Sequence, residues 1–128
     1  MSMKNEIVPA TGQHTFSMDR EMMALLEFFG IDPYKDALAS EVFLSIVGNA
    51  QKKRGTTTRE IAERAGATQA AAAYHMRRFL EMGFVEKRGR EYFMRGGTLG
   101  GAISEIEGDY LRKIDRVRKI AKRIDEYI

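Results

Sequence analysis

The stretch that decides the fold is TTTREIAERAGATQAAAAYHMRRFLEMGFVEKRGREYFMR, residues 56–95. Its first part predicts a short amphipathic helix whose inward positions are Ile61, Ala62 and Ala65. Thr58 is placed to cap the start of this helix. Gly66 then ends it, because glycine tolerates the left-handed conformation that a sharp turn requires. Thr68 follows at once as a second cap, so the sequence predicts two helices joined by a very short turn, as in a helix-turn-helix.

The second predicted helix covers about residues 68–82 and stops at Gly83. Helical spacing places Ala72, Met76, Phe79 and Leu80 on its inward side. The other side carries Gln69, Ala70, Ala73, Tyr74, Arg77 and Arg78. Its alanines keep the helix slim enough to approach base edges in a major groove, although they also serve simply as strong helix formers. Because arginines follow on the same side, we favour the groove interpretation.

After Gly83 the pattern changes to that of two short strands around a glycine-containing turn, spanning residues 84–95. A hairpin of this size is not stable alone, so Val85, Tyr92 and Met94 are expected to pack onto the helices. Its tip is expected in solvent, where Lys87, Arg88 and Arg90 would face DNA phosphates. Two turn-linked helices followed by such a hairpin predict a winged helix-turn-helix, in a fold that is mainly α with a small β-hairpin wing.

The charge of the chain is concentrated in this region. The 128 residues carry a formal net charge of only +3. Between Gln51 and Arg95, however, eleven Lys and Arg residues stand against five Glu residues. A basic segment of this kind is typical of a surface that contacts a polyanion.

The ordered combination of these pieces resembles a known group of proteins. The segments Thr58–Ala62, Ala65-Gly66, Tyr74–Phe79 and Gly83–Lys87 together resemble the DNA-binding domain of ArsR/MarR-like winged-helix transcriptional regulators, especially archaeal ones. Phe29–Tyr34 is similar to the entry of archaeal TrmB-like regulators. The resemblance implies dimeric, promoter-binding repressors or activators whose second helix reads the major groove.

Metal sensing by this chain is not expected. The sequence has no Cys, and its two histidines are His14, in the N-terminal segment, and His75, which we interpret as flanking the DNA-facing side or contacting a phosphate. Glu105 and Asp109 lie four residues apart and could hold a hard cation, but solvated surface charge is the favoured interpretation. No metal ligand set is therefore predicted.

Cofactor and enzyme signatures are absent from the sequence as well. The glycine-rich segment 95–101 lacks the Lys and Ser/Thr of a phosphate-binding P-loop, so we interpret it as a joint that lets the DNA-binding part change its angle. No nucleophile with a nearby base and no dinucleotide fingerprint was found. The sequence predicts no cofactor, no catalytic residue and no enzymatic activity.

The segments before residue 56 are predicted to comprise a tail and two helices. Residues 1–17 are expected to be disordered, without a signal peptide or membrane span, which favours a cytoplasmic protein. Met18–Phe29 is predicted as a helix whose Met and Phe residues belong to the core or to a partner subunit. Asp32 and Pro33 are expected to start another helix that runs to about Ala50. Its core positions are Val42, Phe43, Ile46 and Val47.

The C-terminal segment, residues 98–128, is predicted as one long amphipathic helix that begins at Thr98. Its apolar stripe provides the candidate dimer-interface residues Ile103, Ile106, Tyr110, Ile114, Val117, Ile120 and Ile124. Nothing else of matching size remains to cover this stripe, so pairing with the same helix of a second subunit is expected. The alternative is that the helix folds back onto the helices before residue 56.

These observations predict a sequence-specific, homodimeric transcriptional regulator that binds double-stranded DNA at a promoter or operator. Residues 18–97 would form the DNA-binding domain and residues 98–128 the dimerisation helix. The alternative function is a winged-helix adaptor in transcription or RNA machinery. In that case the arginines of this chain would bind an acidic protein partner. No residue marks a site for a small-molecule effector.

Overall fold

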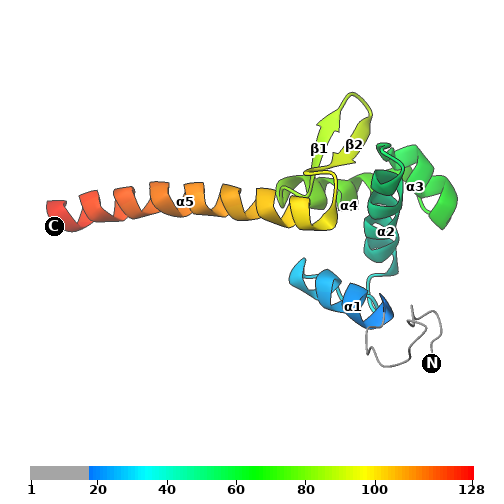
Figure 1. The fold of residues 1–128 in the computed structure, drawn as a ribbon, viewed down its shortest axis with the longest axis horizontal. Helices are drawn as coiled ribbons and strands as arrows, with labels where there is room; N and C mark the ends of the chain where they lie inside the picture. The colour runs from blue at the N-terminus through cyan, green and yellow to red at the C-terminus, as the bar shows by residue number, and fades with distance from the viewer. Residues whose placement is uncertain (1–17) are drawn as a thin grey trace. The chain divides into compact units, whose positions relative to one another are not determined.

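The computed structural model describes residues 18–128, which form five helices and one two-stranded antiparallel sheet (Figure 1). The elements are α1 (Met18–Phe28), α2 (Ala37–Gln51), α3 (Thr58–Ala65), α4 (Gln69–Glu81), β1 (Val85–Arg88), β2 (Glu91–Met94) and α5 (Leu99–Tyr127). This order confirms the predicted winged helix-turn-helix with a long C-terminal helix. The predicted tail, with His14, lies outside the described residues.

The chain divides into two compact units, one ending at Glu41 and the other running from Val42 to Ile128. In the first unit, α1 is followed by Gly30 in the left-handed conformation (φ 76°). The prediction that Asp32 starts the next helix is wrong, because its carboxylate accepts a hydrogen bond from the Tyr34 amide (2.9 Å) in a separate turn. Asp36 is the residue whose carboxylate accepts from the helical amide of Ala39 (3.2 Å), so α2 begins four residues later than expected.

Helices α3 and α4 form the turn-linked pair. The predicted cap of α3 is wrong by one residue: the Thr57 side chain accepts from the Glu60 amide, and Thr58 is already helical. Gly66 closes α3 with φ 67°, and Thr68 caps α4 by accepting from the Ala71 amide at 3.0 Å, so both of these predictions are confirmed. The two helices are therefore separated only by residues 66–68.

The hairpin pairs Val85 with Met94 and Arg88 with Glu91, which leaves a two-residue turn at Gly89 and Arg90. Gly89 has φ 63°, a conformation that two-residue hairpin turns often require and that glycine adopts without strain. A short third segment lies beside β2, because Thr56 and Tyr92 exchange backbone hydrogen bonds of 2.9 and 2.8 Å. This bridge connects the wing to the start of α3 and was not expected from the sequence.

The core of the second unit is an aromatic cluster. The ring of Phe43 in α2 stacks on Phe84 with centroids 5.2 Å apart, and Phe79 of α4 lies 5.7 Å from Phe84. These three side chains are almost completely buried, as are Ile61, Met76 and Val85. The predicted core residues Val42, Phe43, Ile46, Val47, Tyr92 and Met94 are buried too. Burial of this apolar surface packs the hairpin and the turn-linked helices into one hydrophobic core.

Candidate nucleic-acid interface

One side of α4 is left open to solvent. Gln69, Ala70, Tyr74 and Arg77 are exposed and Ala73 is half-buried. The opposite side of the helix is in the core, with Ala72 and Met76 fully buried and Phe79 1% exposed. Since residues four apart lie on one side of a helix, Ala70, Tyr74 and their neighbours form a continuous strip. That strip presents an amide, a phenol and a guanidinium, which are groups that hydrogen-bond to DNA bases and phosphates.

The second predicted arginine of α4, Arg78, is less accessible than Arg77. Arg78 is half-buried, and its Nη1 lies 3.1 Å from Nδ1 of His75. Because arginine only donates, Nδ1 of the imidazole accepts this bond. The Arg78 guanidinium also lies 5.9 Å from the centre of the Tyr74 ring. Arg78 thus supports the orientation of Tyr74 at the edge of the strip.

The expectation that His75 flanks the DNA-facing side is wrong. Its side chain is only 9% exposed, within a helix that presents its neighbour Tyr74 to solvent at 55%. Adjacent helical residues point about 100° apart, so one position separates the open side from the core. The sequence shows no signal for this burial, because histidine occurs in both environments.

The wing cations do not all lie at the tip. Only Arg90 belongs to the turn, where it is exposed, whereas Lys87 and Arg88 lie in β1. Successive strand residues point to opposite faces, so these two side chains separate. The ammonium group of Lys87 lies 5.5 Å from the centre of the Tyr92 ring, and the Arg88 guanidinium lies 4.3 Å from that of Phe93. Arg88 also donates to the Glu86 carboxylate (Nε to Oε2, 2.9 Å), which offsets part of its charge.

A buried polar network that was not expected from the sequence holds the turn-linked helices in place. The amide Nδ2 of Asn49 donates to Thr56 Oγ1 at 2.8 Å and to the Glu60 carboxylate at 2.9 Å. Asn49 is 4% exposed, so these bonds form in a partly desolvated environment where an unpaired amide would be costly. Arg64 of α3 extends the network by donating to Ser45 Oγ at 2.8 Å. The network fixes α3 relative to the last turns of α2. Because α4 follows α3 after a short turn, the network also helps to position α4.

Arg95 ties the end of the wing to α5. Its guanidinium donates to the Gly83 carbonyl at 2.8 Å and to the carboxylates of Asp109 at 2.7 Å and Glu105 at 3.0 Å. The hydrogen bond with Asp109 is the main cause that raises the pKa of Arg95 above its ordinary value. The hydrogen bond from Arg95, with a smaller contribution from Arg112, lowers the pKa of Asp109 below its usual 3.8.

These contacts change two predictions about the segment. Glu105 and Asp109 are solvent-accessible surface charges, as the favoured interpretation expected, but both also pair with Arg95, which the sequence did not indicate. The glycine-rich joint is also braced: a Cβ on Gly96 would lie 2.4 Å from the backbone carbon of Gly101. Thr98 caps α5 as predicted, accepting from the Gly101 amide at 2.9 Å. The start of α5 is therefore packed against the segment that follows the wing.

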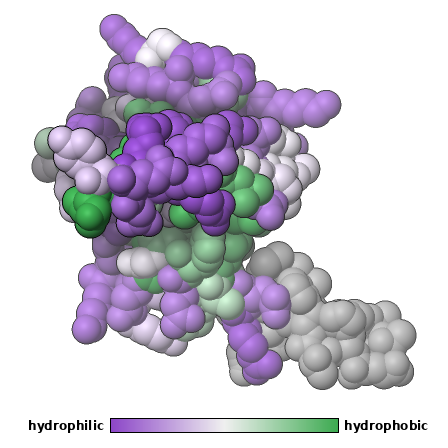
Figure 2. Space-filling model, turned by 90° about the vertical axis from the view of Figure 1, so that its left-hand side faces the viewer, coloured by the Kyte–Doolittle hydropathy of each residue, from purple (hydrophilic) through white to green (hydrophobic). Residues whose placement is uncertain are grey.

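Beyond this start, the apolar side of α5 is open. Ile106 is buried and Ile103 half-buried, but Tyr110 is 59% exposed, Val117 50% and Ile124 54%. Ile114 and Ile120 are also exposed. Figure 1 shows α5 continuing as one helix well past α4 and the hairpin. Figure 2 faces the C-terminal end of α5 and shows hydrophobic residues at a surface on which hydrophilic ones dominate. Within the described residues, nothing covers the stripe from Tyr110 onward.

Comparison with known proteins gives one match. Residues 44–86 match a family described as winged helix-turn-helix DNA-binding. The matched segment contains about half of α2, the turn-linked helices and the first residues of the hairpin, and it supports a DNA-binding regulator. Comparisons with curated proteins and with solved structures gave no match.

Residues 18–128 lack two other kinds of feature. No group of three or more His, Asp or Glu side chains is arranged to hold a metal ion among these residues. Within the same part of the chain, no helix combines the length and the apolar character that a membrane crossing needs.

Proposed function

We propose that this protein is a sequence-specific, homodimeric regulator of transcription that inserts α4 into the major groove of double-stranded DNA. The exposed strip of α4 is the observation that carries this proposal. Its residues Gln69, Tyr74 and Arg77 project from a helix whose opposite side is fixed in the core. A rigid helix with a slim N-terminal half is the element that winged helix-turn-helix proteins place in the groove.

In this arrangement each part of the site has a separate role. The first turn of α4, capped by Thr68, directs free backbone amides at a phosphate. Gln69 is placed to bind adenine with its amide, and Arg77 reaches a base edge or the backbone. Arg90 at the hairpin turn contacts a phosphate beside the groove, while Lys87 and Arg88 add positive potential from β1. The half-buried Arg78 positions Tyr74.

The homodimer is supported by the open stripe of α5. Large apolar side chains from Tyr110 to Ile124 are about half exposed, an arrangement that is unfavourable for an isolated helix in water. Pairing with the same stripe of a second chain buries them and gives two copies of α4 related by a two-fold axis. Such a dimer reads a two-fold-symmetric site, as expected for a cytoplasmic regulator that binds at a promoter.

The test is fluorescence anisotropy of labelled duplexes over a range of salt concentrations. Genomic fragments that bind best are compared with shuffled sequences of the same composition. Arg90→Ala is expected to weaken binding to all duplexes and to reduce the salt slope by about one unit. Gln69→Ala is expected to cost about 1–3 kcal/mol on the preferred fragment and little on shuffled DNA.

Arg118→Ala is the matched control, because it removes one positive charge from the exposed part of α5 instead of the winged region. It should leave both the affinity and the salt slope close to those of the unmodified protein. Weak binding that is the same for every duplex, and that neither Arg90→Ala nor Gln69→Ala reduces, would contradict the proposal and favour an adaptor.

A further inference from the structure

The middle of α5 differs in charge from its start. Residues 99–111 contain three acidic side chains and no basic one, whereas residues 112–123 contain seven Lys or Arg side chains against one Asp. Every residue from 111 onward is exposed, and Figure 2, which faces this end of the helix, shows a mostly hydrophilic surface. The proposed contacts of α4 and the wing use none of these cations.

Four of the seven cations form one row along the helix. They follow one another at spacings of four, three and four residues and are Arg112, Arg116, Lys119 and Arg123. At about 100° and about 1.5 Å per residue, this basic row lies within a sector of about 60° and is about 16 Å long. Its centre is roughly a third of a turn from that of the apolar side, so pairing of two apolar sides leaves the basic row open to solvent.

The stability of the helix does not explain the basic row. Cations three or four residues apart on a helix repel each other and destabilise it, and the row contains three such neighbouring pairs. Cations stabilise the last turn of a helix, but the last turn of α5 has no basic residue and includes Asp125 and Glu126. Solubility alone is served by mixing both signs of charge. A negatively charged partner is the remaining reason to place these cations side by side.

Two members of the basic row have partners on the same helix. Arg112 donates to the Asp109 carboxylate at 2.7 Å, and the Lys119 ammonium lies 3.2 Å from the Asp115 carboxylate. Both cationic side chains are 69% exposed. Ion pairs this open to water contribute little to stability, so these two cations can exchange their partners for another anion.

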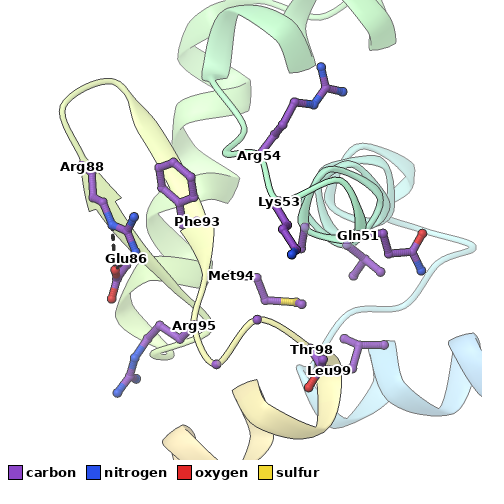
Figure 3. A pocket seen from close by; sticks show the side chains of 14 residues that line it. Gln51, Lys53, Arg54, Glu86, Arg88, Phe93, Met94, Arg95, Thr98 and Leu99 are labelled. Atoms are coloured by element: carbon purple, nitrogen blue, oxygen red, sulfur yellow. Dashed lines mark hydrogen bonds and ion pairs between the residues drawn. The ribbon is translucent and has the colours of Figure 1, made fainter.

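The other two members have no such partner. The guanidinium groups of Arg116 and Arg123 make no hydrogen bond or ion pair with any of residues 18–128. The wing differs, because there Arg88 is turned toward Glu86 and pairs with it (Figure 3). Two guanidinium groups on one side of α5 are therefore available to an anion.

We propose that the basic row of α5 is a second DNA-binding surface, which holds the phosphates of a duplex without reading its sequence. A duplex carries one negative charge per about 1.7 Å of its axis, so a row about 16 Å long can lie against several phosphates. Three of its four members are Arg, whose planar guanidinium binds a phosphate through two parallel hydrogen bonds. The choice of DNA as the anion rests on the proposed function and on the DNA-binding family that residues 44–86 match. The contact itself does not require α4 to read a sequence.

The test is fluorescence anisotropy of a shuffled duplex, measured with the full-length protein at several salt concentrations. The row variant, Arg116→Gln with Arg123→Gln, keeps the helix propensity and removes two charges from each chain. It should weaken binding at least about tenfold at a fixed salt concentration and lower the salt slope by about two units. The off-row variant, Arg118→Gln with Lys122→Gln, removes the same charge from another side of α5. It should bind with nearly the affinity and the salt slope of the unmodified protein.

Three further measurements separate a lost contact from a damaged helix. The melting temperature of the row variant should stay the same or rise, because two repelling charges are gone. Its state of association in analytical ultracentrifugation should equal that of the unmodified protein. Arg116→Lys with Arg123→Lys keeps both charges and should retain most of the salt slope.

The proposal is overturned if the row variant binds the shuffled duplex undiminished, if the off-row variant loses as much affinity, or if the row variant changes its state of association. It is overturned too if no duplex is bound. A protein that prefers certain fragments, while the row variant binds shuffled DNA undiminished, keeps the proposed function and loses the second surface. Binding that needs the basic row but shows no preference for any fragment has the opposite meaning.

Discussion

Helices α4 and α5 have the same kind of amphipathic sequence but opposite surroundings. The apolar side of α4 is in the core, with Met76 fully buried and Phe79 1% exposed, and its polar side is open. The apolar side of α5 is itself open, with Val117 50% and Ile120 46% exposed. An amphipathic pattern thus shows that a helix needs a partner without showing whether the partner belongs to the same chain. We propose that the DNA-reading surface is the polar side of α4 and that the dimer interface is the apolar side of α5.

The largest expected effect comes from removing the core anchor of α4. Phe79→Ala deletes a ring that packs against Phe43 and Phe84, and it should lower the free energy of unfolding by about 3–5 kcal/mol. Urea unfolding at low protein concentration measures this loss. Val117→Ala on α5 should cost far less under the same conditions, because half of that side chain is already in water. Similar losses of unfolding free energy for the two variants would contradict the difference in burial between the apolar sides of α4 and α5.

The second prediction concerns the open side of α5. Val117→Asp places an unpaired carboxylate in the proposed dimer interface and should raise the dimer dissociation constant at least about a hundredfold. Analytical ultracentrifugation measures the change. Lys122→Asp introduces the same group five residues further along, on the far side of the helix, and should leave the dimer in place. A protein that is monomeric before any substitution would contradict this part of the account.

The third prediction concerns the brace between the wing and α5. The pKa of Asp109 is lower in the folded protein than its usual 3.8, so this carboxylate stabilises the fold above that pH. The contribution should be lost as the pH falls below about 3.8 and through the lower value of the folded state. The melting temperatures of the unmodified protein and Asp109→Asn should therefore differ at pH 7, with the variant lower, and converge in acid. A constant difference at every pH would show that the charge of Asp109 is not responsible.

The smallest expected effect tests where α3 begins. Thr57→Ala removes the side chain that accepts from the Glu60 amide and should cost about 1 kcal/mol. Thr58→Ala changes the first helical residue, which is not the cap, and should cost less. Denaturant unfolding of the two variants gives the order directly. The reverse order would indicate that Thr58 is the cap, as the sequence alone suggested.

The sequence predicted best what depends on neighbouring residues. Gly66, Thr68 and the turn at Gly89 each act through the conformation or hydrogen bonds of the next few residues, and all three are where the sequence placed them. The spacing of Met76 and Phe79 similarly fixed the inward side of α4.

Features that depend on distant partners were not predictable. The pairing of Arg95 with Asp109 joins residues fourteen apart, and the bridge between Thr56 and Tyr92 joins the wing to the turn-linked helices. The burial of His75 likewise depends on what packs around α4. Asp32 and Asp36 lie close together in the sequence, and aspartate at either position could cap a helix. The path of the chain decides which of the two does so.

The central claim is that α4 of a two-fold-symmetric dimer reads DNA sequence. Selection of bound duplexes from a random pool, followed by sequencing, tests it most directly. The account predicts an enriched motif of two inverted half-sites whose centres lie about 10 base pairs, or a multiple of one helical turn, apart. The motif should lose definition within each half-site when the selection is repeated with Gln69→Ala. A pool that stays random after several rounds, despite measurable binding, would contradict the account.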